Sequence, residues 1–98
     1  MITQSPSIED IDNTRKRLIY RSWHRGTREM DLIMGSFADA HVPGFDAAQL
    51  QVYEALLVNN DPDLYNWITG QETPPANIMS DVFEKLLSHR FTSLRGTE

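Results

Sequence analysis

The spacing of apolar residues limits what this chain can fold into more than any other feature. Breaks rich in Gly, Pro, Asn and Asp divide the chain into about five segments, and within each one the apolar residues recur at helical spacing rather than alternating as in a strand. We therefore predict an all-α fold, a small antiparallel bundle of about five helices. Because the length of 98 residues fits one small domain, residues 1–98 should form a single helical domain, with 7–91 as its structured core and flexible termini.

Start and stop signals set the predicted helix bounds. Ser7 is the expected N-cap of the first helix, and Gly35 weakens the second by roughly 1 kcal/mol relative to alanine. The third helix begins with Asp46 followed by Gln49 three residues later, the arrangement of a capping box. The predicted helices cover residues 7–25, 27–41, 46–58, 60–70 and 78–91.

The fourth predicted helix is the shortest. Asp61 is its expected N-cap, Pro62 takes the first helical position, and Gly70 stops the helix. Asp63 then lies near the positive end of the helix dipole. We expect Trp67 to be a core residue that anchors this helix through one large aromatic side chain.

Basic residues gather near the start of the chain. Six of the nine Lys and Arg residues stand between positions 15 and 28, whereas from position 29 onward eleven acidic residues face three basic ones. A domain that is basic at its first helix and acidic elsewhere suits a charged protein partner. Nucleic acid is the competing partner, because Tyr20 and Trp23 lie among the arginines, but the net charge of -5 weighs against it.

The residue types that carry catalytic or metal chemistry are sparse. The chain has no Cys, which excludes disulfides and thiolate metal sites, and His24, His41 and His89 stand too far apart for a recognisable zinc or iron motif. Asp61 and Asp63 would resemble an acid/base pair, but their place at a helix start already explains them. We predict a protein that is not an enzyme and binds no metal.

The first eighteen residues, MITQSPSIEDIDNTRKRL, place acidic residues before basic ones, unlike a signal or transit peptide. The longest apolar runs are also only a few residues. We predict a cytoplasmic protein without membrane contact, and we expect it to be a monomer at micromolar concentration.

The stretch SWHRGTRE lies where two predicted helices meet. In one interpretation Gly26 closes the first helix in a left-handed conformation, and Glu29 occupies the first turn of the second. This does not explain why Trp23, Arg25 and Arg28 gather there, since these residue types are common in interface hot spots. In the other interpretation Gly26 lets a partner backbone approach closely, between the opposite charges of Arg25 and Glu29. The residues alone support the two interpretations about equally.

Two motifs resemble one known family. The residues RGTRE around Gly26 resemble the Arg-Gly-x-x-Glu motif of the succinate dehydrogenase flavinylation factors of the SdhE type. The segment DPDLYNW, residues 61–67, resembles that family's Asp-Pro-Asp-Leu-aromatic-Asn-Trp segment, at a similar distance downstream. The resemblance runs from about Arg17 to Gly70.

The resemblance implies an assembly factor, or chaperone, with a small helical bundle as its fold. Members of this family assist the covalent attachment of FAD to the flavoprotein subunit of succinate dehydrogenase, and sometimes of fumarate reductase. It implies that the FAD belongs to the client flavoprotein and that this chain binds no cofactor of its own. Its share would be to hold the client so that the reacting histidine and the flavin are already aligned.

By position, the resemblance implies that Arg25, Gly26 and Glu29 form the patch that contacts the client. Neighbouring residues, and the acidic residues of the second motif, extend this patch. The predicted partner-binding residues are Arg25, Gly26, Glu29, Arg28, Trp23, Asp61 and Asp63. A nucleic-acid-binding or regulatory module that uses the basic first helix remains the alternative function.

Overall fold

The computed structural model describes residues 8–95 of the chain, and the side chains of residues 10–89. Within the described residues the fold consists of helices without a strand, which confirms the predicted all-α class. Two short 3-10 turns lie at Val42–Gly44 and Ala76–Ile78. The α-helices are α1 (Ile8–Trp23), α2 (Arg28–His41), α3 (Ala47–Leu57), α4 (Asp61–Thr69) and α5 (Asp81–Arg95).

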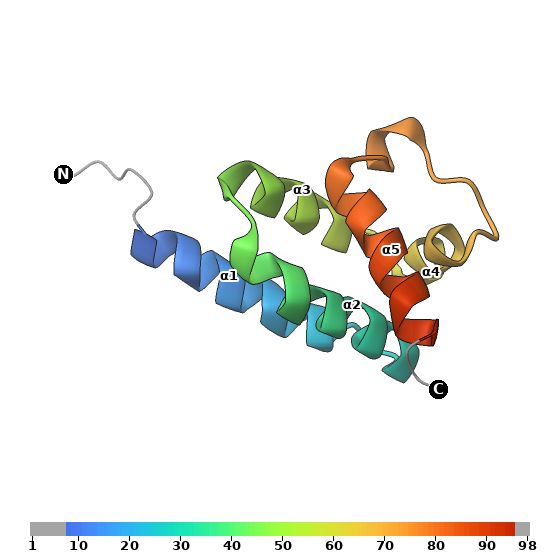
Figure 1. Cartoon of the computed structure of the whole chain (residues 1–98), viewed down its shortest axis with the longest axis horizontal. Helices are drawn as coiled ribbons and strands as arrows, with labels where there is room; N and C mark the ends of the chain where they lie inside the picture. The colour runs from blue at the N-terminus through green and yellow to red at the C-terminus, as the bar shows by residue number, and fades with distance from the viewer. Residues whose placement is uncertain (1–7, 96–98) are drawn as a thin grey trace.

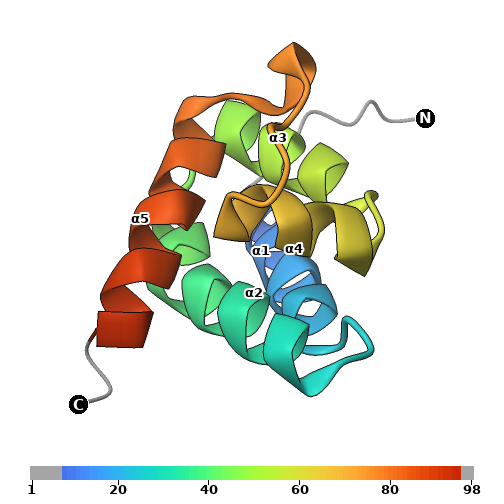
Figure 2. The same ribbon diagram turned by 90° about the vertical axis from the view of Figure 1, so that its right-hand side faces the viewer.

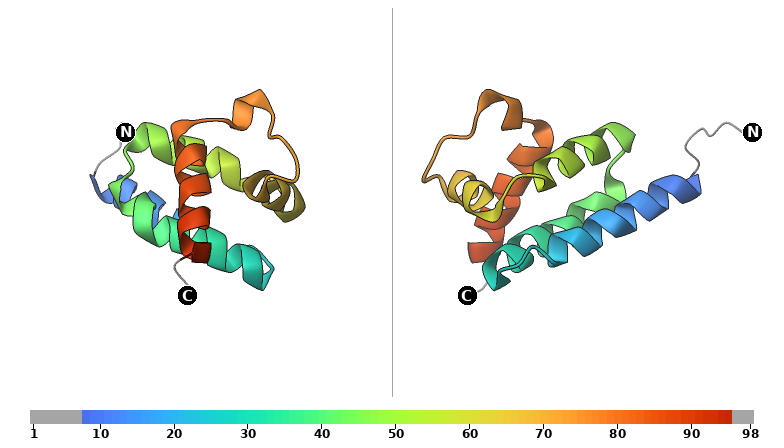
Figure 3. Two further views of the ribbon diagram at one scale, coloured as in Figure 1. Left: turned by 45° about the vertical axis from the view of Figure 1, so that its right-hand side comes forward. Right: turned by 180° about the vertical axis from the view of Figure 1, so that it is seen from behind.

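The first two helices form an antiparallel pair on which the others rest. In Figure 1, α1 and α2 lie side by side along the lower edge, α3 lies above them, and α5 crosses α2 and α3. Figure 2 shows α4 between α2 and α3, beside α5. The segment that joins α4 to α5 arches away from the helices in both views of Figure 3. The corner between α1 and α2 therefore lies at one end of the molecule, near α4.

The core fills the space between the α1–α2 pair and the other three helices. Two hydroxyls are buried there as a pair: those of Ser22 and Tyr53 share a 2.6 Å hydrogen bond, and Ser22 Oγ donates to the carbonyl of Leu18 at 2.7 Å. Burial raises the pKa of Tyr53 to about 12, so the phenol stays neutral. Tyr53 is the contribution of α3, and the other four α-helices supply the next largest fully buried side chains, which are Leu18, Met34, Phe37, Leu64, Phe83 and Leu86.

Several predicted boundaries are confirmed and others shift. The capping box at α3 is present, with Asp46 Oδ1 accepting from the Gln49 N–H at 2.9 Å and Gln49 Oε1 accepting from the Asp46 N–H at 3.0 Å. Gly70 ends α4 with a left-handed φ of 83°. The predicted N-cap Asp61 is wrong, because Asn60 accepts from the Asp63 N–H at 2.9 Å and Asp61 is the first helical residue. The expected cap at Ser7 lies outside the described residues.

The last helix differs from its predicted range at both ends. Ile78 belongs to a 3-10 turn, and α5 begins at Asp81, where Ser80 Oγ accepts from the Phe83 N–H at 3.0 Å. The helix continues to Arg95, beyond the end predicted at Phe91. A serine cap thus decides the start, which the apolar spacing alone placed too early.

The expectation that Trp67 is a core residue that anchors α4 is confirmed only in part. Leu64 and Ile68 are the buried residues of α4, whereas Trp67 is half-buried and packs against the edge of the core. The two smaller aliphatic side chains, and not the indole, are therefore the fully enclosed residues of this short helix. Among the described residues, no helix is long and apolar enough to cross a membrane.

Candidate functional site

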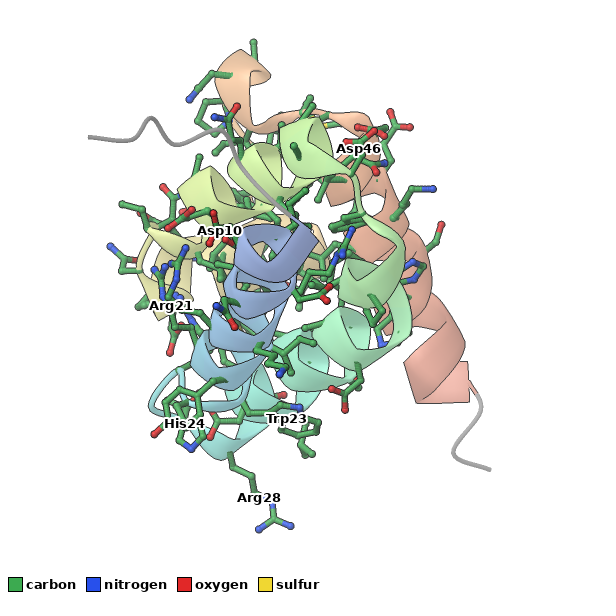
Figure 4. All side chains as sticks on the ribbon, turned by 90° about the vertical axis from the view of Figure 1, so that its left-hand side faces the viewer. Asp10, Arg21, Trp23, His24, Arg28 and Asp46 are labelled. Carbon is green, nitrogen blue, oxygen red and sulfur yellow. The ribbon has the colours of Figure 1, made fainter. Side chains whose placement is uncertain are left out.

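The corner between α1 and α2, which we define as residues 23–29, brings the first motif to one end of the molecule. Figure 4 shows Trp23, His24 and Arg28 together at this end, with the Arg28 side chain pointing away from the body of the protein. His24 is exposed and stacks on Tyr20, with ring centroids 4.0 Å apart. The corner is therefore a protruding feature, and its atoms divide into those that turn inward and those that face outward.

Gly26 has a backbone conformation that favours glycine. Its φ is +122°, which confirms the predicted positive φ, but α1 already ends at Trp23, so Gly26 turns the connection and does not close the helix. A Cβ added to Gly26 would meet only Asp61 Oδ2, at 4.0 Å. The space outside Gly26 is therefore open, and no described part of this chain fills it.

Asp31, in the first turn of α2, holds this conformation in place. Its Oδ1 atom accepts hydrogen bonds from the backbone N–H groups of both Arg25 and Gly26, the latter at 3.2 Å. Thr27 caps the helix separately by accepting from the Met30 N–H at 3.2 Å. Two consecutive backbone donors of the corner are thus fixed by one carboxylate. The sequence alone does not single out Asp31, because an acidic residue in a first helical turn is common for dipole reasons alone.

Arg25 turns inward, which corrects the prediction that its charge is offered to a partner. Only 11% of its side chain is exposed. Its Nε donates to Asp61 Oδ1 at 2.8 Å, and its two terminal nitrogens donate to the carbonyls of Leu57 at 2.7 Å and Asn59 at 2.6 Å. The end of α3 leaves carbonyls without helical partners, and the planar guanidinium fits them together with the carboxylate.

The Arg25–Asp61 ion pair joins the two motifs that the sequence analysis treated separately. Asp61 is 17% exposed and uses Oδ1 for the guanidinium, so its main role in the fold is to hold the corner against α4. Asp63 is half-buried in the first turn of α4, where an acidic side chain complements the helix dipole. Both acidic residues of the second motif are thus accounted for by folding.

Trp23 is fixed by a glycine that the sequence analysis recorded only as a weakness of α2. A Cβ at Gly35 would overlap the indole of Trp23, so the absence of a side chain there lets the ring lie directly on the α2 backbone. The indole Nε1 donates to Asp39 Oδ1 at 3.3 Å. The sequence signal for this contact is a glycine inside one predicted helix, Gly35, together with a Trp near the end of the helix before it.

Two hollows flank Gly26. The first, which we call the Arg28 hollow, lies on the α1 side, and the second, the Tyr65 hollow, lies between α2 and α4. Thr27 lines both of them. The Arg28 hollow is lined by Trp23, His24, Gly26, Thr27, Arg28, Asp31 and Leu32. The Tyr65 hollow is lined by Thr27, Glu29, Met30, Asp61, Pro62 and Tyr65.

The outward residues of the corner carry charge and apolar surface. Arg28 and Glu29 are exposed, and no ion pair within the described residues involves either of them. Leu32 is 51% exposed beside Arg28. Glu29 Oε2 accepts a hydrogen bond from the Tyr65 hydroxyl at 3.3 Å. The described residues contain no group of three or more side chains that could hold a metal. What the corner presents suits recognition of another protein.

Most of the basic residues on α1 form ion pairs with acidic residues of the same chain. Arg17 and Arg21 both approach Glu54 Oε2, at 2.8 Å and 3.5 Å, and the neighbouring Arg15 pairs with Asp12 at 3.0 Å. The hydrogen bond from Arg17, and secondarily the positive charges of Arg17 and Arg21, lower the pKa of Glu54. Together with the inward Arg25, this neutralisation weakens the basic surface that a nucleic-acid-binding helix would need.

Comparison with known proteins assigns the family. Residues 16–90 match the family described as flavinator of succinate dehydrogenase, a range that contains both motifs. The chain belongs to that family. Curated relatives named succinate dehydrogenase assembly factor 2, mitochondrial, include one from Dictyostelium discoideum, 39% identical over 82 residues, and one from Drosophila grimshawi, 35% identical over 83 residues.

The relatives are longer than the matched region. The Dictyostelium match covers 84% of this chain and 57% of the relative, and the Drosophila match covers 83% and 56%. A relative of the same name from Aspergillus flavus is 38% identical over 73 residues, which is 74% of this chain and 25% of the relative. The chain therefore spans about half the length of the first relatives it matches.

Proposed function

We propose that this protein is an assembly factor that binds the flavoprotein subunit of succinate dehydrogenase and promotes its covalent attachment of FAD. The observation that carries the proposal is the family match over residues 16–90, which includes the corner and the segment of α4 tied to it. The flavoprotein of fumarate reductase is a second client of the same chemistry. The names of the curated relatives, as assembly factors of succinate dehydrogenase, support the first client.

The corner would contact the client through its outward face. Gly26 offers open space where a partner backbone can approach, and the exposed Arg28 and Glu29 on either side offer opposite charges that fix its orientation. The inward residues would serve this contact indirectly, because Asp31 and the Arg25–Asp61 pair keep the corner in one conformation. A pre-ordered surface loses less conformational entropy on binding.

The chemical step would belong entirely to the client, whose own histidine and FAD react. This protein would act as a binding partner and not as a catalyst, by favouring the client conformation in which the reacting groups are close and aligned. We propose further that the chain holds no flavin of its own, that it acts as a monomer, and that it works in the cytoplasm. Because the curated relatives are named mitochondrial, fractionation of the host cell is the test of the compartment.

Two measurements in the protein's own host test this function. Tagged protein should co-purify with a flavoprotein subunit at low and moderate salt, and deletion of the protein should reduce the covalent flavin fluorescence of that subunit after denaturing electrophoresis. Recovery of no flavoprotein at either salt concentration, together with unchanged flavinylation in the deletion strain, would overturn the proposal. The purified protein should also be colourless, whereas a strong visible flavin spectrum would contradict the proposed absence of a flavin.

A further inference from the structure

The Tyr65 hollow lies beside the corner, where residues of the two motifs meet. Three of its residues, Asp61, Pro62 and Tyr65, belong to α4, so the hollow extends the surface of the corner onto a second helix. Tyr65 is half-buried, packs against the core, and is held in position by it. The hollow is thus a surface of fixed shape beside the open space at Gly26.

The floor of this hollow is apolar. Met30, which is 2% exposed, Pro62 and Tyr65 supply the apolar part of its lining. Such a surface accepts an aliphatic stem or a flat group better than a small polar one.

The rim of the hollow is negative. It contains two carboxylates, Glu29 and Asp61, but the inward guanidinium of Arg25 pairs with Asp61 Oδ1 at 2.8 Å and offsets that charge. Glu29 has no such cation among the described residues. The Tyr65 hydroxyl donates to Oε2 of Glu29 at 3.3 Å, which leaves Oε1 to accept from a partner. The net charge of the rim is therefore negative at Glu29.

We propose that the Tyr65 hollow receives a basic side chain of the client flavoprotein, with Tyr65 as a positioning residue that orients Glu29 toward it. The aliphatic stem of the incoming side chain lies on Pro62 and Met30, and its cationic head binds Glu29 beside the aromatic ring of Tyr65. This inference rests on the proposed function, and it adds the chemical identity of one group that the client must supply.

Binding measurements with purified proteins test the inference. The full chain is titrated with the FAD-loaded, not yet covalently modified flavoprotein subunit of its host, at low and at moderate NaCl. Glu29→Gln should raise Kd about tenfold, because it removes the charge of a hydrogen-bonded ion pair, and should flatten the salt dependence of Kd. Glu72→Gln, which makes the same charge change at an exposed position in the segment after α4, is the matched control and should leave Kd within about twofold.

Two variants of Tyr65 separate its hydroxyl from its ring. Tyr65→Phe removes only the hydrogen bond to Glu29, so we expect Kd to rise about two- to fivefold. Tyr65→Leu removes the ring as well, and a further loss of about two- to fivefold is expected if a cation lies against it. In the Glu29→Gln background, Tyr65→Phe should have little further effect, because a positioning residue acts through the group that it orients.

The outcomes distinguish this inference from the function on which it rests. If the wild-type chain binds no flavoprotein, the proposed function and this inference both fail. If it binds, but Glu29→Gln behaves like Glu72→Gln, the basic side chain is excluded while the proposed function stands. An apolar occupant would leave the affinity unchanged or improved in Glu29→Gln and reduced only in Tyr65→Leu, which also overturns the inference. Thermal melting of each variant confirms that a change in Kd does not come from unfolding.

Discussion

The inward and outward halves of the corner carry the same kinds of residue but have opposite relations to the rest of the chain. Arg25 and Arg28 stand three positions apart, yet Arg25 is enclosed by a carboxylate and two carbonyls while Arg28 points into solvent. Asp31 and Glu29 differ in the same way, since Asp31 accepts from the corner backbone and Glu29 faces the Tyr65 hollow. Residues of the corner and of the first turn of α2 therefore divide between holding the surface and forming it.

This division predicts that the two halves respond differently to substitution. Changes to inward residues should lower the free energy of unfolding and impair function as a consequence. Changes to outward residues should impair function while leaving stability almost unaltered. A variant that does not follow this pattern would show that its residue is assigned to the wrong half.

The largest loss of stability is expected at Arg25. Arg25→Ala removes the partner of Asp61 and leaves two carbonyls without donors, so it should lower the free energy of unfolding by about 3 kcal/mol. Arg25→Lys should recover only part of this, because an ammonium cannot match the three acceptors with a planar fork. Urea unfolding followed by circular dichroism measures both. Melting of Arg25→Ala at the wild-type temperature would place Arg25 in the outward half.

A somewhat smaller loss of stability is expected for a substitution at Gly35, and it tests whether Trp23 is held against α2. Gly35→Ala should destabilise the fold by about 1–3 kcal/mol, because the new methyl group overlaps the indole of Trp23, even though alanine favours helix. Gly44→Ala is the control, since a Cβ there has no neighbour within 4 Å. If Gly35→Ala were as stable as Gly44→Ala, the indole would be free to move outward and Trp23 would be available to the client.

A change of pH should act on the opposite side of the molecule. Burial lowers the pKa of His41 and of His89 in the folded state, and the positive charge of Lys85 adds to the effect on His41. As the pH falls through the unfolded value of 6.5, the unfolded chain binds protons first, so this contribution to stability is present above that pH and is lost below it.

Urea unfolding at pH 7.5 and at pH 5.5 measures this effect, and the free energy of unfolding should be lower at pH 5.5. Replacing both histidines with glutamine should flatten the dependence between these pH values. An unchanged slope in the double variant would assign the dependence to other groups.

The smallest effect on stability is expected for the outward charges. Arg28→Ala and Glu29→Ala should each change the free energy of unfolding by no more than about 0.5 kcal/mol, because both side chains are exposed. Each should nonetheless lower covalent flavinylation of the client in cells. Thermal melting of each variant measures its stability, and the covalent flavin fluorescence of the client in cells that carry the variant measures its function. Normal flavinylation in both variants would remove the outward half from the site.

The sequence predicted features that depend on neighbours in the chain. The capping box of Asp46 and Gln49 and the stop at Gly70 are local hydrogen-bond and backbone signals, and the structure confirms both. The spacing of apolar residues predicted the all-α class for a similar reason, because the residues on one face of a helix are only three or four positions apart in the sequence. The N-cap of α4 was misassigned by one residue because Asn60 and Asp61 are both good caps, and the competing demand of Arg25 for the Asp61 carboxylate is not a local property.

The candidate site was predicted only in part, because its division arises from contacts between distant segments. The Arg25 side chain reaches residues more than thirty positions away, and no local pattern distinguishes an arginine that turns inward from one that faces solvent. Tyr65 was missed for the same reason, since it meets Glu29 only after α2 and α4 have packed. The resemblance to the family located the corner, and the structure then separated its supporting residues from its exposed ones.

If the open space at Gly26 receives the client, the size of a side chain placed there should decide whether the client can bind. Gly26→Ala and Gly26→Arg both force a side chain into a positive φ, so both should lose a similar 1–2 kcal/mol of stability, of the order expected for backbone strain.

The decisive measurement is the covalent flavin fluorescence of the client subunit, in cells that carry each Gly26 variant at equal abundance. We expect Gly26→Ala to retain most of the flavinylation and Gly26→Arg to abolish it, because only the larger side chain fills the space that a partner backbone needs. Full flavinylation with a folded Gly26→Arg variant would contradict it, and would leave Gly26 as a residue required only for the turn between α1 and α2.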